Sequence, residues 1–142
     1  MMNRNASILI CDDDEDDLYL VKSIFNDTKF NNQTIYLKNG EELLEYLNNS
    51  KKDISVGLIL LDLNMPKIDG REALKIIKSN PELRRIPVVI LTTSNAPQDI
   101  EMCYTLGANC FMTKPSSYEG LNDAIKTLSK FWLELSYLPI KR

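Results

Sequence analysis

Residues 57–77 read GLILLDLNMPKIDGREALKII, and this stretch predicts the architecture of the whole chain. Gly57–Leu61 is a short continuous apolar run of strand length, and it ends at an acid, Asp62. A loop with Pro66 and the turn pair Asp69-Gly70 follows. A helix-like stretch comes next, with apolar residues at Ala73, Leu74, Ile76 and Ile77. The order of strand, polar loop and helix is the repeating unit of an α/β sheet.

The same order recurs along the rest of the chain. The other expected strands are Ala6–Cys11, Thr34–Leu37, Pro87–Leu91 and Asn109–Thr113. Strands that are apolar on both faces indicate a parallel sheet covered by helices on both sides. Right-handed crossovers make a doubly wound sheet the default topology. We therefore expect residues 1–142 to form a single α/β domain with a five-stranded, doubly wound parallel sheet.

Short local signals predict where the helices begin and end. The first helix is expected from Asp16 to about Thr28. Capping boxes predict two more starts, Asn39 with Glu42 and Ser116 with Glu119, the second opening a helix that runs to about Ser136. A further helix is expected over Pro97–Leu106, because proline favours a first helical position and Gly107 favours a helix end.

The composition excludes several classes of function. A net charge of −3 argues against a general nucleic-acid binder. The chain has no histidine, which excludes His-based acid–base catalysis, His-activated nucleophiles and ordinary zinc centres. Cys11, Cys103 and Cys110 lack CxxC spacing and are expected to be small apolar residues in a reducing compartment. The first apolar run is too short for a signal peptide or a membrane span, so we expect a cytoplasmic protein.

Polar side chains follow four of the expected strands. In chain order they are Asp12, Asp13 and Asp14, then Asp62, then Thr92, Thr93 and Ser94, and finally Lys114 with Pro115. The carboxyl ends of parallel strands meet at the edge of the sheet where ligands bind. Carboxylates brought close together repel each other unless a cation neutralises them, and Mg²⁺ prefers such oxygen ligands.

This constellation suggests transfer of a phosphoryl group onto an aspartate. Asp13 and Asp62 would supply carboxylates to the metal, and Asp62 would also be the nucleophile. A phosphoryl group held there would find Lys114 as a point charge and the Thr92 hydroxyl as a donor. Each residue alone has an ordinary structural explanation, as a helix cap or a turn residue. The agreement of four strand ends favours the functional interpretation.

Other motifs fit less well. The pattern at Asp12, Asp14 and Asp16 resembles the start of an EF-hand loop, but Asp17 replaces the required Gly and Ser23 the required Glu. Neither GxxxxGK[ST] nor GxGxxG occurs, so the sequence supports neither a P-loop nor a dinucleotide site.

Four stretches of the chain closely resemble the receiver domain of bacterial two-component response regulators. They are ILICDDDEDD (8–17), LILLDLNMPKIDGREAL (58–74), PVVILTTS (87–94) and CFMTKP (110–115). The resemblance implies the flavodoxin-like receiver fold, Mg²⁺ as cofactor and output through protein–protein contacts. It further implies a phospho-acceptor module rather than an enzyme with a separate substrate. The donor would be a sensor histidine kinase or a histidine phosphotransfer protein, in keeping with the absence of histidine here.

The resemblance also implies a role for individual residues. Asp62 resembles the phospho-acceptor, and Asp13 the acid that binds the metal directly. Asp12 resembles the acid that acts mainly through a metal-bound water. The backbone carbonyl of Asn64 is similar to the third protein ligand of the metal.

The remaining implied roles concern the response to phosphorylation. Thr92 resembles the switch hydroxyl, which moves toward the phosphoryl group, and Lys114 the lysine that pairs with that group. Phe111 matches the switch aromatic, whose rotamer follows the threonine, although many members carry a Tyr there. Pro115 is expected to follow a cis peptide bond.

The C-terminal stretch FWLELSYLPIKR, residues 131–142, resembles that of single-domain regulators associated with bacterial phytochromes and similar sensor kinases. Because the chain ends about 25 residues after Pro115, we expect this stretch to extend the last helix and no output domain to follow. Two interpretations of its apolar side chains stay open, a cap on the domain's own core or a surface for a homodimer or partner. The side chains concerned are Phe131, Trp132, Leu135 and Leu138.

Two rival functions also stay open. A haloacid-dehalogenase-type phosphatase would use Asp12 as its nucleophile but needs a further acidic pair after a later strand, where only Asp99 follows. A scaffold that keeps the fold without the chemistry predicts that a key group is missing, yet all are present. These groups are Asp12, Asp13, Asp62, Thr92 and Lys114.

Overall fold

The computed structural model describes residues 3–49 and 55–140 and has one five-stranded parallel sheet. The strands are β1 (Ser7–Cys11), β2 (Thr34–Leu37), β3 (Val56–Leu61), β4 (Val88–Thr92) and β5 (Cys110–Thr113). Their order across the sheet is β2-β1-β3-β4-β5. The chain therefore crosses from one side of β1 to the other after β2, which confirms the expected doubly wound sheet.

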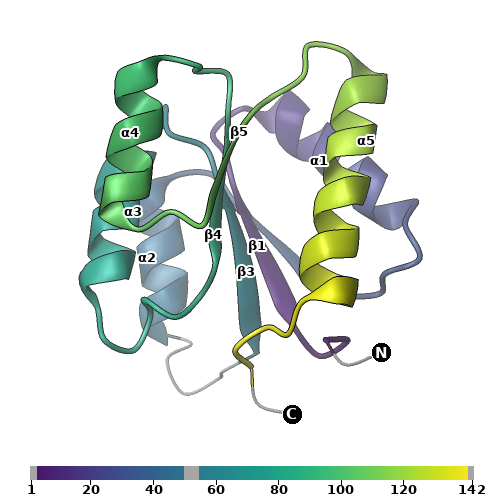
Figure 1. Ribbon diagram of the computed structural model, residues 1–142, viewed down its shortest axis with the longest axis horizontal. Coiled ribbons are helices and arrows are strands. Elements are labelled where there is room, and N and C mark those ends of the chain that lie inside the picture. The colour runs from purple at the N-terminus through teal and green to yellow at the C-terminus, as the bar shows by residue number, and fades with distance from the viewer. Residues whose placement is uncertain (1–2, 50–54, 141–142) are drawn as a thin grey trace.

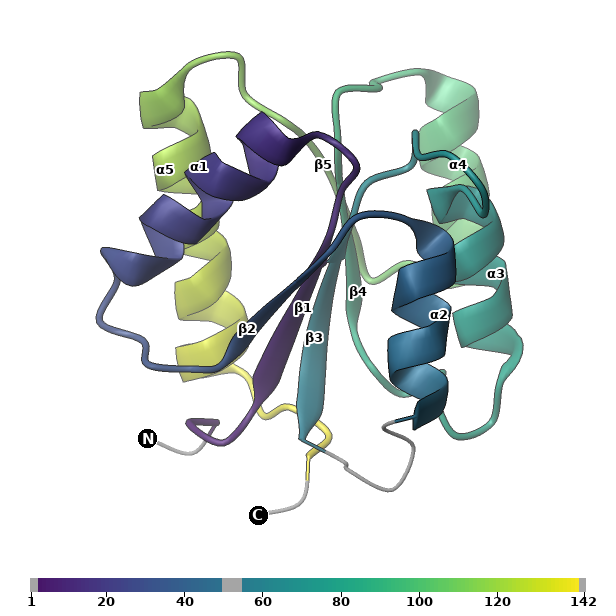
Figure 2. The same ribbon diagram turned by 180° about the vertical axis from the view of Figure 1, so that it is seen from behind.

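Five α-helices cover the two faces of this sheet (Figures 1 and 2). On one face lie α1 (Glu15–Asn26) and α5 (Tyr118–Ser129). On the other lie α2 (Gly40–Asn49), α3 (Gly70–Ser79) and α4 (Pro97–Leu106). No helix of the described residues is long and apolar enough to cross a membrane.

The central strands β1 and β3 separate two apolar cores. Successive strand side chains point to opposite faces. Leu9 and Ile59 therefore pack under α2, α3 and α4, whereas Ile8 and Leu58 pack under α1 and α5. All four side chains have no exposed surface, as expected for strands covered on both faces.

The helix starts agree with the local signals, except at α5. The Asn39 side chain accepts from the Glu42 amide at 2.9 Å, which confirms the predicted cap. The N-cap of α5 is Ser117 and not Ser116, with Ser117 Oγ accepting from Gly120 N at 3.0 Å. Both serines suit an N-cap, and the helix that begins after Ser117 brings Gly120 close to Pro115, since a Cβ on Gly120 would lie 2.7 Å from Pro115 Cβ. The first turn of α5 thus packs tightly on Pro115.

Ile76, one of the apolar residues of the expected helix, is 40% exposed. The buried residues of α3 are Gly70, Ala73, Leu74 and Ile77, which form a narrower stripe. Among the cysteines, Cys11 and Cys103 are buried and Cys110 is partly buried.

The last helix continues beyond α5 as a π-helix, η1 (Lys130–Leu135). The four apolar side chains that were expected to share one helix face differ in their exposure. Phe131 and Leu135 are exposed, whereas Leu138 is 2% exposed and packs in the core with the partly buried Trp132. The wider π turn shifts side-chain positions, and the helix ends before Leu138. Residues 141 and 142 lie outside the described residues.

Candidate functional site

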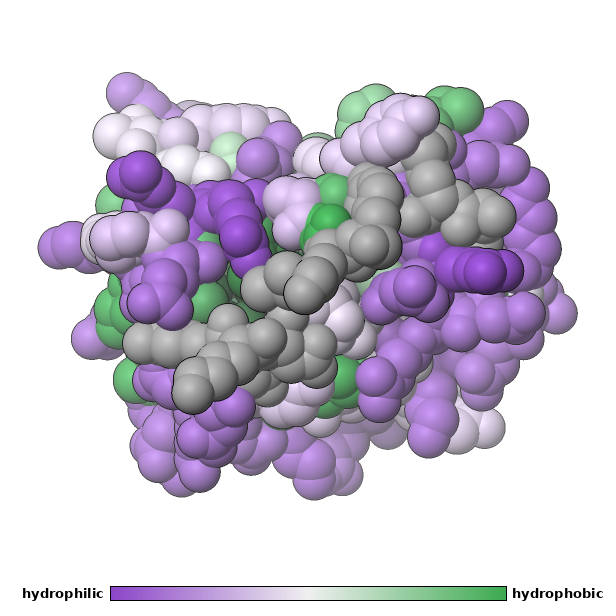
Figure 3. Space-filling model, turned by 90° about the horizontal axis from the view of Figure 1, so that it is seen from below, coloured by the Kyte–Doolittle hydropathy of each residue, from purple (hydrophilic) through white to green (hydrophobic). Residues whose placement is uncertain are grey.

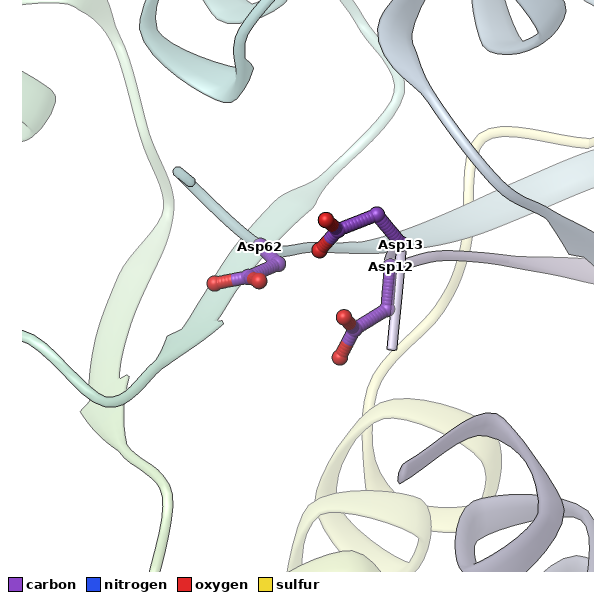
Figure 4. A group of neighbouring side chains, drawn as sticks. All are labelled: Asp12, Asp13 and Asp62. Carbon is purple, nitrogen blue, oxygen red and sulfur yellow. The ribbon is translucent and has the colours of Figure 1, made fainter. Parts of the chain in front are cut away.

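An acidic cluster lies where β1 and β3 end. Asp12 follows β1 and Asp62 follows β3, its neighbour in the sheet, with Asp62 N donating to Cys11 O at 3.0 Å. Asp12, Asp13 and Asp62 each offer a carboxylate oxygen, and these oxygens all lie within 4.8 Å of one another. Figure 4 shows the three carboxylates gathered around one space between the two strand ends.

The cluster combines buried and accessible carboxylates. Asp12 and Asp62 are 5% and 7% exposed, whereas Asp13 is exposed at the opening. Three carboxylate oxygens suit a hard divalent cation, which completes its shell with waters and further oxygen ligands. The donor set therefore fits Mg²⁺ or Mn²⁺. Asn64 lies exposed in the loop just after Asp62, and a role for its carbonyl stays a prediction.

Lys114 follows β5 and reaches back across the sheet to this cluster. Its ammonium lies 2.5 Å from Asp12 Oδ2, 2.8 Å from Asp17 Oδ2 and 3.8 Å from Asp62 Oδ2. Its side chain is 10% exposed. Burial alone would lower the pKa of Lys114, but the hydrogen bonds to Asp12 and Asp17 outweigh this effect and hold the pKa above its usual value. The lysine therefore stays charged among the carboxylates.

The pKa of Asp12 is also raised, and for a carboxyl group this favours the neutral form. Burial raises the pKa of Asp12 to about 6, although the bonds from Lys114 and from the Asp14 amide favour the ionised form. The Asp62 carboxylate also contributes to the higher pKa. One lysine therefore only partly compensates the buried negative charge, and the site retains an attraction for a further cation.

The Thr92 hydroxyl is buried and lacks a hydrogen-bond partner among the described residues. Thr92 ends β4, next to β3, and has no exposed surface. Its Oγ1 makes no hydrogen bond with the described residues. An unsatisfied buried hydroxyl costs about 1–3 kcal/mol. This hydroxyl therefore has a free-energy reason to donate to a group that enters the site.

Phe111 lies on β5 and is partly buried against the core under α2, α3 and α4. Its backbone amide donates to the Tyr104 hydroxyl of α4 at 3.1 Å. Because β5 is an edge strand, this bond satisfies a backbone group that no neighbouring strand reaches. The side chain of Phe111 has no hydroxyl, and the hydroxyl that contacts its backbone belongs to Tyr104.

The prediction of a cis peptide bond before Pro115 is wrong. The described residues contain no cis peptide bond, so the Lys114–Pro115 bond is trans. The trans isomer is the commoner one for bonds that precede proline.

Two features of the site region were missed from the sequence. Asp17 binds Lys114 from the first turn of α1, and the acidic run that contains it was read mainly as strand end and helix cap. Arg71 of α3 donates to Asp99 of α4 at 2.9 and 3.0 Å, and Asp99 also accepts from Ser94 at 2.7 Å. The second network joins two helices to the loop that follows Thr92. No sequence pattern linked Arg71, Ser94 and Asp99, because they lie far apart in the chain or in different elements.

The family-model comparison identifies the family to which the fold belongs. The model of the response regulator receiver domain matches residues 8–126, which run from the second residue of β1 to within α5 and include the residues of the acidic cluster. The chain belongs to this family. It is thus a receiver domain of two-component signalling.

Known relatives support the same conclusion. This receiver domain is 38% identical over 135 residues to the response regulator Rcp1 of Synechocystis, covering 93% of this chain and 92% of Rcp1. It superposes on a crystal structure of the phosphorylated cyanobacterial phytochrome response regulator RcpA with a TM-score of 0.88 and 37% identity, covering 94% and 98% of the chains. A Mn²⁺-bound structure of Rcp1 gives a TM-score of 0.87 and 38% identity, covering 94% and 99%. The similarity to phytochrome-associated regulators is therefore confirmed.

Proposed function

We propose that this receiver domain accepts a phosphoryl group on Asp62 from the phosphohistidine of a sensor histidine kinase or a histidine phosphotransfer protein. The observation that carries the proposal is the meeting of Asp12, Asp13 and Asp62 with Lys114 at one edge of the sheet. The metal ligands would be Asp13, Asp62, the carbonyl of Asn64 and Asp12, the last mainly through a bound water, with Mg²⁺ as the ion. The Mn²⁺-bound structure of Rcp1 supports a divalent ion.

The two oxygens of Asp62 are in different surroundings. Oδ1 accepts from the Leu63 amide at 2.9 Å, and Oδ2 faces the Lys114 ammonium at 3.8 Å. The carboxylate is thus held by one oxygen while it attacks phosphorus, and the bond from phosphorus to the donor histidine breaks. A bound divalent cation would neutralise charge between the carboxylates and the phosphoryl oxygens. Lys114 would pair with one of those oxygens, and Thr92 would donate a hydrogen bond to another.

The same contacts provide a switch. A dianionic group on Asp62 attracts the Thr92 side chain, whose hydroxyl has no hydrogen-bond partner within residues 3–49 and 55–140. Movement of Thr92 opens space into which Phe111 turns, and this changes the surface formed by α4, β5 and α5. We infer that a downstream protein reads this surface, and we expect neither nucleic acid nor membrane as the target.

The exposed residues of η1 provide a second surface for protein contact. Phe131 is 52% exposed, Leu135 62% and the following Tyr137 75%. Exposed apolar side chains grouped in this way favour association. We propose that they form a homodimer contact. Light scattering of the wild type and of Phe131→Ser with Leu135→Ser tests this, and an identical mass for both proteins would contradict it.

The decisive experiment is intact mass after incubation with acetyl phosphate, with and without Mg²⁺. The wild type should gain one phosphoryl group only with Mg²⁺, and Asp62→Asn should gain none. Asp16→Asn is the matched control, because Asp16 is an exposed acid outside the cluster. An adduct that persists in Asp62→Asn would overturn the assignment of the acceptor. A wild type that takes up neither the phosphoryl group nor beryllofluoride would indicate a scaffold instead.

A further inference from the structure

Lys114 is held by a carboxylate that lies outside the proposed metal site. Asp17 projects from the first turn of α1, and its Oδ2 accepts from Lys114 Nζ at 2.8 Å. That contact is closer than the 3.8 Å between Lys114 and Asp62. In the proposed reaction, however, the lysine must pair with a phosphoryl group on Asp62. Lys114 therefore has two competing partners, one on α1 and one after β3.

A divalent ion would change the balance between these partners. It would share the Asp12 carboxylate, which now also accepts from Lys114. Because two cations repel when they share one carboxylate, the bond between Lys114 and Asp12 weakens as the metal site fills. Asp17 is not part of the metal cluster, so its bond to Lys114 persists. The carboxylate of Asp17 is then the main group that keeps the lysine on the α1 side.

We propose that Asp17 is a positioning residue that competes with the phosphoryl group for Lys114 and so lowers the occupancy of the phosphorylated state. The inference rests on the proposed function of Asp62 and adds a residue that tunes it. Charge-assisted hydrogen bonds of this length are among the stronger polar contacts. The Asp17 side chain is also only 29% exposed, so solvent screens the pair less than a surface pair.

The local structure allows this contact to be removed cleanly. The N-cap of α1 is Asp14, whose side chain accepts from the amides of Asp16 and Asp17. Asp17→Asn keeps these backbone bonds and the size of the side chain. Asp16→Asn is a matched control with the same change of charge on the adjacent residue, whose side chain is exposed. A difference between the two variants therefore reports on the contact with Lys114.

The test measures the affinity for beryllofluoride, a phosphoryl analogue, by calorimetry at saturating Mg²⁺. We expect Asp17→Asn to bind about fivefold more tightly than the wild type, and Asp16→Asn to stay within about twofold. Asp17→Glu keeps the charge and should return toward the wild-type affinity. In a Lys114→Ala background, adding Asp17→Asn should change nothing, because the residue through which Asp17 acts is gone.

Three results would overturn the inference. They are equal affinities of Asp17→Asn and Asp16→Asn, weaker binding by Asp17→Asn, and an Asp17→Asn effect that persists without Lys114. Each of them leaves the proposed function intact as long as the wild type binds beryllofluoride and is phosphorylated on Asp62. If the wild type does neither, the proposed function fails first, and the inference about Asp17 falls with it.

Discussion

The ammonium of Lys114 lies 2.5 Å from Asp12 Oδ2 and so joins the end of β5 to the end of β1, although β3 and β4 separate these strands in the sheet. Both side chains are nearly buried, at 10% and 8% exposure. Lys114 therefore neutralises part of the negative charge of the acidic cluster, and a metal ion bound there would compete with it for the same carboxylate.

Removal of Lys114 should strengthen metal binding. In Lys114→Ala the Asp12 carboxylate loses its cationic partner, so we expect the affinity for Mn²⁺ to rise about tenfold. Titration of free Mn²⁺ by electron paramagnetic resonance measures this. Lys38→Ala is the control, because Lys38 is an exposed lysine whose ammonium pairs with the exposed Glu15, outside the acidic cluster. An unchanged or weaker affinity in Lys114→Ala would show that lysine and metal do not compete.

Metal binding should weaken in mild acid. The proposed metal site uses the ionised form of Asp12, whose pKa is raised to about 6 by burial. Below that pH a proton competes for the carboxylate, so the apparent Mn²⁺ affinity should fall by up to about tenfold per pH unit. The chain has no histidine, the side chain that ordinarily titrates near this pH. An affinity that stays constant from about pH 7 to about pH 5 would contradict the role of Asp12.

The network around Asp99 should stabilise the fold in a pH-dependent way. Hydrogen bonds from Ser94 and Arg71 hold the pKa of Asp99 below its usual value. Its ionised form therefore stabilises the protein above about pH 4, and this contribution is lost as the pH falls through the lower, folded value. We expect Asp99→Asn to lower the free energy of unfolding by about 1 kcal/mol at neutral pH.

Urea unfolding at neutral and acidic pH checks this prediction. The difference between Asp99→Asn and the wild type should shrink toward acidic pH. Glu101→Gln is the control, since Glu101 is an exposed acid on the same helix. A difference that is constant with pH would mean that the charge of Asp99 is not what stabilises the network.

The Asn3 side chain should be essential for the C-terminal segment. Its amide group donates to the carbonyls of Trp132, Leu133 and Ser136, and its Oδ1 accepts from the Leu138 amide. Asn3 has no exposed surface, so Asn3→Ala removes four hydrogen bonds between a buried side chain and the backbone of the C-terminal segment. We expect a loss of about 3 kcal/mol in the free energy of unfolding.

Fluorescence of the single tryptophan reports on this segment directly, because Trp132 lies in η1. Asn3→Ala should shift its emission to longer wavelength before global unfolding in urea. Asn5→Ala, two residues away and exposed, should behave like the wild type. Equal stability of the two variants would show that η1 holds its place without Asn3.

The end of the molecule opposite the acidic cluster differs in character from the site. Seen from below in Figure 3, its visible side chains are mainly hydrophilic, with apolar ones between them. The acidic cluster lies at the other end because the carboxyl ends of all the parallel strands point there (Figure 1). The acidic cluster and the view in Figure 3 thus lie at opposite ends of the sheet.

The sequence alone predicted that Asp12 and Asp62 lie at the ends of strands. The apolar runs before Asp12 and Asp62 predicted strands, and parallel strands bring such residues to one edge. Gly107 was predicted to end α4 and adopts φ 109°, which glycine adopts without steric cost. These predictions succeeded because strand periodicity and helix ends depend on residues close together in the chain.

Contacts between distant segments depended on the tertiary structure. Asn3 and Leu133 are 130 positions apart, and no local pattern relates them. The same holds for Asp17 with Lys114 and for the division between exposed Phe131 and buried Leu138. The order β2-β1-β3-β4-β5 was also left open by the strand pattern. Sequence determined which groups stand at the strand ends, because local periodicity and backbone sterics act between neighbours. Only the packing of helices on the sheet decided which of those groups meet, because distance in space follows from the placement of whole elements.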